Sequence, residues 1–192
     1  MNSRLSMVSA ILLAACLIIL AAAPRPVDCN VIEQYAAAER FSHSESPVVT
    51  ENETKYVYNI PIDDELQLQI YEICDEYGVD NSLIFAMMYV ESRYIADKIG
   101  DNGNSYGLLQ IQPRWWSATM DQVGATDLLN PIENVKTGCA IIQYLYSLYG
   151  DERSVLQAYN TGKPYTDNGY ANKVYAARDR LEVRPYADGG CY

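Results

Sequence analysis

The sequence predicts an all-α domain that follows an N-terminal signal or anchor helix and a flexible linker. Three observations predict it. Apolar residues recur at helical spacing in several stretches after residue 60, residues that favour helix ends flank these stretches, and only Tyr56–Tyr58 alternates like a strand. The chain has 192 residues, the length of about one domain, and 49 % of them are apolar, enough for a sizeable core.

Residues 1–23 are expected to direct export. Residues 7–23 carry no charge, Arg4 precedes them and Pro24 follows them. As a helix this stretch measures roughly 26 Å, slightly less than the roughly 30 Å hydrocarbon core of a bilayer. It is therefore either a signal peptide or a short membrane anchor, and we expect membrane contact only if it stays uncleaved. In both cases the rest of the chain is expected outside the cytoplasm.

Residues 24–58 are expected to form a flexible linker, because they are polar and show little periodicity. The domain is expected over 59–182, and 183–192 as a C-terminal tail. His43, the single histidine, lies in the linker, which argues against a histidine triad or a histidine metal cluster. We expect neither a metal nor a cofactor.

The charge balance argues against two classes of partner. The chain has 14 Lys plus Arg and 25 Asp plus Glu, a net charge of −11. Nucleic-acid binding and docking on anionic lipid both need clustered basic residues. The 17 tyrosines combine stacking area with a hydroxyl, which suits polar clefts such as sugar sites. The alternative is that the excess of tyrosine over phenylalanine has no functional meaning.

The helices are predicted in chain order from apolar stripes and end signals. The first opens at Asp63–Asp64 and closes at Gly78. The second follows Asp80 and spans 83–90; it is apolar on every face, so we expect it to be buried on every side. After a loop rich in Gly, Asn and Asp, a helix is predicted through Trp115–Trp116.

The longest predicted helix begins at Asn130–Pro131 and ends at Gly150. Short helices are predicted over 152–159 and 170–181. Beyond the export segment the cysteines are Cys29, Cys74, Cys139 and Cys191. Their three full pairings stay open, although two of these cysteines, Cys74 and Cys139, lie on apolar stripes and are expected to meet.

Glu91 is the residue with the clearest chemical potential. It directly follows the all-apolar helix, on the face of Leu83 and Met87. Burial raises the pKa of a carboxyl, and the negative end of a helix does not favour its ionisation. A glutamic acid that stays protonated near neutral pH can act as a general acid. The alternative is a glutamate that turns out to water at a helix end.

Six short segments, one of which contains Glu91, follow one another along the chain in a characteristic order. They are 77–83 (YGVDNSL), 88–92 (MYVES), 107–113 (GLLQIQP), 130–145 (NPIENVKTGCAIIQYL), 158–162 (AYNTG) and 169–174 (GYANKV). Together they resemble the lytic transglycosylase SLT domain family, relatives of goose-type lysozyme. The resemblance covers roughly residues 60–181. Leu109, Gln112 and Thr161 depart from the family's usual residues, and Thr161, in place of a smaller residue, is expected to narrow the cleft.

The resemblance implies a lysozyme-like helical fold acting on bacterial peptidoglycan glycan strands. Glu91 is then expected to protonate the β-1,4 bond between N-acetylmuramic acid and N-acetylglucosamine. No aspartate nucleophile is implied, since the substrate's acetamido group stabilises the cation-like state. The same glutamate would next act as base on the muramyl 6-hydroxyl, which leaves a 1,6-anhydro end. The resemblance also implies an extracellular or cell-wall location.

The resemblance further assigns substrate-binding roles around Glu91. Ser92 is expected to orient the helix end, and Gly107 and Gln110 to line the cleft. Tyr159 and Asn160 are expected to hold the glutamate or the acetamido group, and Tyr170 to lie at the same site.

Two other functions stay open at this point. If Asp97 or Asp101 held a water opposite Glu91, the enzyme would hydrolyse like a goose-type lysozyme. The second alternative is a wall-binding or assembly module that keeps the fold but catalyses no reaction. The alternative for Asp97 and Asp101 is that both are solvated loop residues without a catalytic role. The number of subunits is left open by the sequence.

Overall fold

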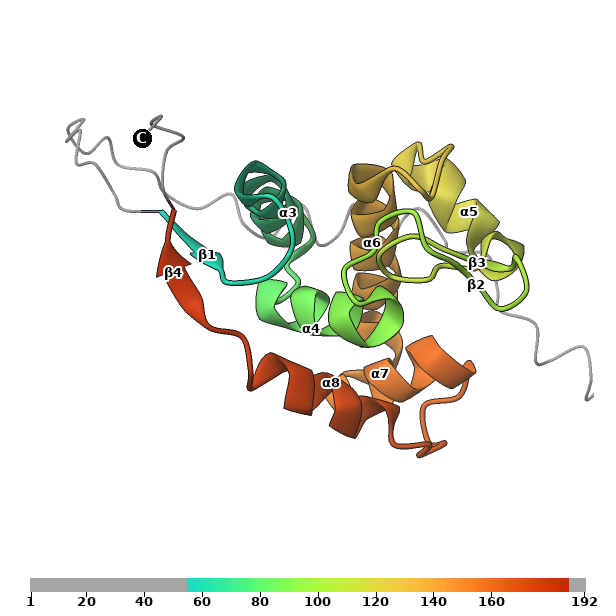
Figure 1. Cartoon of the computed structure of the whole chain (residues 1–192). Helices are drawn as coiled ribbons and strands as arrows, with labels where there is room; N and C mark the ends of the chain where they lie inside the picture. The colour runs from blue at the N-terminus through green and yellow to red at the C-terminus, as the bar shows by residue number, and fades with distance from the viewer. Residues whose placement is uncertain (1–54, 187–192) are drawn as a thin grey trace, which may run out of the picture. The chain divides into compact units, whose positions relative to one another are not determined.

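The computed structural model describes residues 55–186, and these form six helices and two small two-stranded sheets (Figure 1). The helices are α3 (Asp64–Tyr77), α4 (Asn81–Ser92), α5 (Pro113–Val123), α6 (Pro131–Tyr149), α7 (Glu152–Thr161) and α8 (Tyr170–Arg178). The strands are β1 (Tyr56–Tyr58), β2 (Ile99–Gly100), β3 (Ser105–Tyr106) and β4 (Val183–Pro185). The predicted all-α class is confirmed, because helices supply nearly all of the packing.

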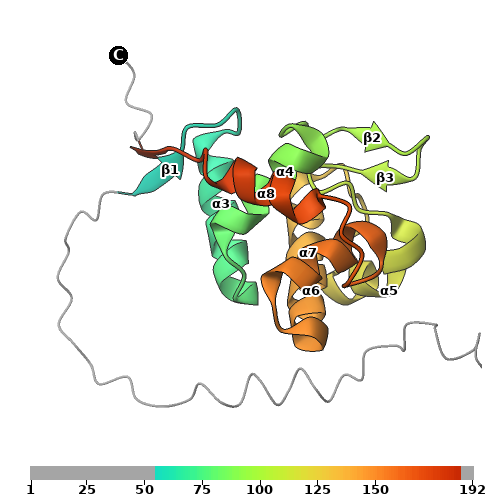
Figure 2. The same ribbon diagram turned by 90° about the horizontal axis from the view of Figure 1, so that it is seen from below.

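Helix α4 lies at the centre of the domain, as its apolar sequence predicts. Residues 83–88 are all buried there, with α3 on one side and α8 packed along the other (Figures 1 and 2). Phe85 contacts the rings of Tyr58 and Tyr71 edge-on, at centroid distances of 5.2 and 5.6 Å. A central helix of this kind fixes the position of whatever residue stands at its end.

The predicted helix ends are confirmed at their capping residues. Asp63, Asp80 and Asn130 each accept hydrogen bonds from backbone N–H groups of the first helical turn. Gly78 and Gly150 end their helices in the left-handed conformation that glycine adopts without steric cost. Other bounds differ from the prediction. Helix α4 extends to Ser92 and so includes Glu91, and α7 extends to Thr161. Helix α8 ends earlier, at Arg178, and the chain then turns toward β4.

Two pairs of strands were not apparent as pairs in the sequence. Strand β1 pairs antiparallel with β4, Tyr56 opposite Pro185, and places Val57 in the interior. These strands fall in the segments that the sequence assigns to linker and tail, so the folded unit extends a few residues beyond 59–182 at each end. The hairpin of β2 and β3 lies within the predicted loop after α4.

The predicted meeting of Cys74 and Cys139 is confirmed: their Sγ atoms lie 4.0 Å apart, and both thiols are free and buried. The export segment, His43, Cys29 and Cys191 lie outside the described residues, and what the sequence predicts for them stays a prediction. Across residues 55–186, no helix is both long and apolar enough to cross a bilayer.

Candidate active site

Glu91 stands one residue before the end of α4, partly buried, where the helix leaves the core. Burial raises the pKa of its carboxyl to about 7. A hydrogen bond from Tyr170 and the charge of Lys98 act in the opposite direction, and the charge of Asp101 adds to the rise. The predicted elevation of the pKa therefore has the predicted cause, desolvation at the end of an apolar helix.

Tyr170 is the direct partner of Glu91. Its hydroxyl donates to Oε1 of Glu91 at 2.6 Å from the first residue of α8. The side chain is almost fully buried, and this burial raises the pKa of the phenol well above its ordinary value. The hydroxyl therefore stays protonated at any pH of interest and remains a donor. The sequence placed Tyr170 at this site, and the structure brings it there.

Ser92 closes the helix instead of facing the carboxyl of Glu91. Its buried hydroxyl donates to the carbonyl of Met88 at 3.0 Å, one turn back. This contact agrees with the expectation that Ser92 orients the helix end. Arg93 and Tyr94 then take left-handed backbone angles, φ 59° and 66°, which non-glycine residues seldom adopt. The chain thereby reverses sharply beside Glu91.

Lys98 is a site residue that the sequence analysis missed. Its Nζ donates to the main-chain carbonyl of Glu91, at the negative end of α4. A cation here stabilises the helix end and opposes the rise in the pKa of the carboxyl. A single lysine in a polar loop carries no sequence signal for such a role.

The turn at 107–110 borders the site as a tightly enclosed backbone segment. Gly107 has φ 75°, and a Cβ there would lie 2.2 Å from the carbonyl oxygen of Leu128 and from Nδ2 of Asn134. Gln110, at φ 48°, donates through Nε2 to the carbonyls of Lys98 and Gly107, at 3.1 and 2.9 Å. The amide of Gln110, expected to line the cleft, thus ties the β2–β3 hairpin to the turn.

Asn134 of α6 holds the same turn from within the core. Its side chain is fully buried, accepts from the N–H of Leu109, and donates to the carbonyls of Tyr106 and Leu128, each at 2.9 Å. Asn134 lies within the 130–145 segment, but the sequence alone predicts no role for it. A buried asparagine on an apolar helix stripe is the signal that could have identified it.

Tyr159 bonds to a different partner than expected. Its hydroxyl donates to the carbonyl of Leu109 at 2.7 Å, and the hydroxyl that reaches Glu91 belongs to Tyr170. Tyr159 is nevertheless close enough for the charge of Glu91 to contribute, after burial, to its raised pKa. Asn160 is exposed at the end of α7, where its Oδ1 accepts from Asn168 at 2.6 Å in the loop before α8.

The two aspartates of the β2–β3 region differ in their surroundings. Asp101 Oδ2 accepts from Ser105 at 2.5 Å and from Gln112 at 3.0 Å, so this oxygen is engaged in holding the hairpin. Asp97 is exposed. Within residues 55–186, no three His, Cys, Asp or Glu side chains are grouped as metal ligands.

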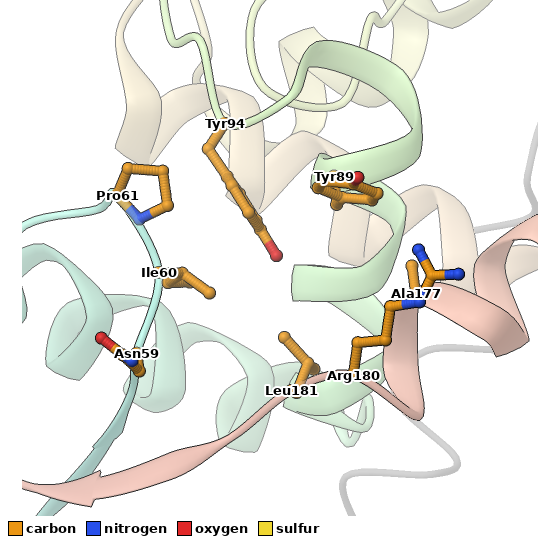
Figure 3. A pocket seen from close by; sticks show the side chains of 8 residues that line it. All are labelled: Asn59, Ile60, Pro61, Tyr89, Tyr94, Ala177, Arg180 and Leu181. Atoms are coloured by element: carbon orange, nitrogen blue, oxygen red, sulfur yellow. The ribbon is translucent and has the colours of Figure 1, made fainter.

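A hollow of about 230 Å³ opens near the end of α4 but does not include Glu91 (Figure 3). The rings of Tyr89 and Tyr94 face it from one side, and Leu181 and Arg180 border it after α8. Asn59, Ile60 and Pro61 complete its wall. The hollow therefore does not mark the position of the candidate catalytic carboxyl.

Comparisons with known proteins identify the family of this chain. Residues 69–180 match the family model of the transglycosylase SLT domain. A transglycosylase of Enterobacteria phage PRD1 is 27 % identical over 103 residues, which are 54 % of this chain and 37 % of that protein. The X-ray structure of an inactive mutant of the lytic transglycosylase Slt from Pseudomonas aeruginosa matches with a TM-score of 0.47 and 21 % identity, covering 62 % of this chain and 22 % of that one. The chain thus spans about a third or less of the length of these two proteins.

Proposed function

We propose that this chain, which belongs to the transglycosylase SLT domain family, is a lytic transglycosylase that cleaves peptidoglycan glycan strands. The observation that carries the proposal is the environment of Glu91: a carboxyl with a pKa near 7, held at one oxygen by Tyr170. A group of this acidity is protonated below neutral pH and can both give and take a proton, as this reaction requires.

In the proposed reaction, Glu91 transfers its proton to the oxygen between N-acetylmuramic acid and N-acetylglucosamine. Since Tyr170 engages Oε1, the proton is delivered from Oε2. The acetamido group of the muramyl sugar stabilises the positive charge that develops at the anomeric carbon. Glu91, now a carboxylate, removes the proton of the 6-hydroxyl, whose oxygen closes the 1,6-anhydro ring.

The protein contributes to these two proton transfers by holding Glu91 in position and by surrounding it with a medium of low dielectric constant. Lys98 fixes the main chain of Glu91, and the buried hydroxyl of Tyr170 fixes its carboxyl. The 107–110 turn, locked by Asn134, is placed to border the sugar. We propose that Gly107, Gln110, Tyr159 and Asn160 act chiefly by shaping this border, and that the chain works outside the cytoplasm on a cell wall.

Hydrolysis in the manner of goose-type lysozyme is the second candidate. It requires a base that activates water, and Asp101 is the acidic side chain whose charge contributes to the raised pKa of Glu91. Oδ2 of Asp101 already accepts two hydrogen bonds, which favours a structural role in the hairpin. Glu91 with its partners likewise favours an enzyme over a wall-binding module, because binding alone needs no carboxyl of raised pKa.

Digestion of purified peptidoglycan followed by mass spectrometry of the soluble fragments tests the proposal. Transglycosylation predicts fragments that end in 1,6-anhydromuramic acid, which borohydride does not reduce. Fragments with reducing ends, heavier by one water, would support hydrolysis and make Asp101→Asn the next variant to assay. Co-sedimentation with walls without release of any fragment would support the binding module.

A further inference from the structure

Two buried cysteines lie side by side behind the candidate site. Cys74 of α3 and Cys139 of α6 are 65 residues apart in the chain, yet their Sγ atoms are separated by 4.0 Å. Both side chains are 0 % exposed. The charge of an ionised Cys139 would reach Tyr159, and the neighbouring Gly138 lies against Leu109. The thiol pair therefore supports the scaffold that holds the 107–110 turn.

We propose that Cys74 and Cys139 join in a disulfide that links α3 to α6. A disulfide bond is about 2.05 Å long, so the two sulfurs must approach each other by roughly 2 Å. The bond therefore requires rotation of both side chains and small shifts of the packed helices. Each sulfur is already the hydrogen-bond neighbour of the other, so the bond replaces a contact that the fold makes in any case.

The folded core is compatible with this pairing and not with a bond from either cysteine to Cys29 or Cys191. Cys74 and Cys139 occupy fully buried positions in the packed core between α3 and α6. For either one to bond with a cysteine near a terminus, that segment would have to enter the core and displace side chains from it. Interior packing at native density does not accommodate such an insertion without a large loss of stability.

The bond forms by thiol–disulfide exchange with an oxidised low-molecular-weight or protein disulfide. The thiolate of one cysteine attacks the donor disulfide, forms a mixed disulfide and releases one donor thiol. The second cysteine then attacks the protein sulfur of the mixed disulfide and releases the other donor thiol. Two cysteine thiols lose two electrons and two protons in all, and the donor disulfide is reduced to two thiols.

This exchange has to occur before the core closes. The hydrogen bond with Cys74 and, after it, burial raise the pKa of Cys139 well above its usual value, so the reactive thiolate is scarce in the folded state. With both side chains fully buried, an oxidant reaches neither sulfur. The redox state that the pair has when the chain folds is consequently retained until it unfolds.

The test is oxidative refolding of the full chain, compared with the same chain refolded under reduction. One sample is refolded with a mixture of oxidised and reduced glutathione, the other with dithiothreitol. Remaining thiols are alkylated in denaturant, and peptide mapping by mass spectrometry without reduction identifies the linked peptides. We expect a Cys74–Cys139 peptide in the first sample alone. Closing a loop of this length predicts a melting temperature higher by roughly 10 °C than in the reduced sample.

Controls separate this pair from the other cysteines. The triple variant Cys16→Ser, Cys29→Ser, Cys191→Ser should retain the linked peptide and the whole shift in melting temperature, whereas Cys74→Ala should lose both. Oxidised glutathione added to the folded, reduced chain should link the pair no faster than the chain unfolds. Free Cys74 and Cys139 after oxidative refolding, or a link from either to Cys29 or Cys191, would overturn the proposal. Rapid linking in the folded chain would overturn its timing before closure of the core.

Discussion

The hydroxyl of Tyr170 donates a 2.6 Å hydrogen bond to Oε1 of Glu91, across 79 residues of chain. This contact brings the first residue of α8 to the end of α4, the two helices that pack along each other most closely (Figure 2). It engages one carboxyl oxygen and lowers the pKa of Glu91 against the stronger opposing effect of burial. One buried phenol thus orients the proposed catalytic group and limits the rise in its pKa that burial causes.

Tyr170→Phe should therefore change the pH dependence of the reaction as well as its rate. Without the donor, the pKa of Glu91 rises further, so the alkaline limb of the kcat/KM profile should move to higher pH. The rate at its optimum should fall by about tenfold or more, because the carboxyl is no longer held in place. Tyr175→Phe, on the same helix, is the matched control and should leave the profile where it is. An unshifted alkaline limb in Tyr170→Phe would contradict this account of the contact.

Glu91→Gln should alter how stability depends on pH. The folded carboxyl gives up its proton near pH 7, and the unfolded one near its ordinary value of 4.5. Between these values the folded chain binds more protons, so this residue makes stability fall as pH rises toward 7, by up to about 3 kcal/mol. An amide does not titrate. The free energy of unfolding of the variant, relative to that of the wild type, should therefore increase by this amount between pH 4.5 and pH 8. Urea unfolding of both proteins at both pH values measures this difference. If the free energy of unfolding changed equally with pH in the two proteins, the raised pKa of Glu91 would be refuted.

The sequence predicts much of this arrangement, and what it misses has physical causes. The apolar helix before Glu91 shows that a carboxyl meets the core there, because periodicity reports burial directly. The hydrogen-bond partners of Tyr159 and Tyr170 lie far away in the sequence, so only the fold distinguishes the two tyrosines. Tyr159 donates to the carbonyl of Leu109, and Tyr170 donates to Glu91. Strands of two or three residues, such as β2 and β3, are too short to show alternation.

Gly107→Ala should destabilise the fold more than Gly103→Ala does. Both glycines have positive φ, 75° and 90°, so an alanine at either position costs about 1–2 kcal/mol in backbone strain. Only at Gly107 would the new Cβ also meet main-chain and buried amide atoms, whereas nothing lies within 4 Å at Gly103. We expect a total cost of about 3 kcal/mol or more at Gly107, measured by urea unfolding, together with loss of activity. Equal costs at the two positions would show that the turn can relax.

Tyr159→Phe should reduce stability and rate together, without moving the pH profile. Its hydroxyl donates to the carbonyl of Leu109, and losing a buried hydrogen bond of this kind costs about 1–3 kcal/mol. The 107–110 turn would loosen, and turnover would fall through position alone. Thermal melting and pH–rate profiles, with Tyr149→Phe as the control, distinguish this role from that of Tyr170. A shifted alkaline limb in Tyr159→Phe would instead place its hydroxyl in contact with the reacting group.

The proposed role of Glu91 is tested most directly by the rate at which Glu91→Gln releases fragments from purified peptidoglycan. The amide keeps the shape of the side chain and can still bond with Tyr170, but it delivers no proton. We predict a loss of at least about 10²–10⁴-fold in the release of 1,6-anhydromuramyl fragments, with wall binding preserved and a melting temperature at neutral pH no lower than that of the wild type. Glu72→Gln, an exposed change on α3, should digest walls like the wild type. Near-normal release by Glu91→Gln would contradict the account and direct attention to Asp97 and Asp101.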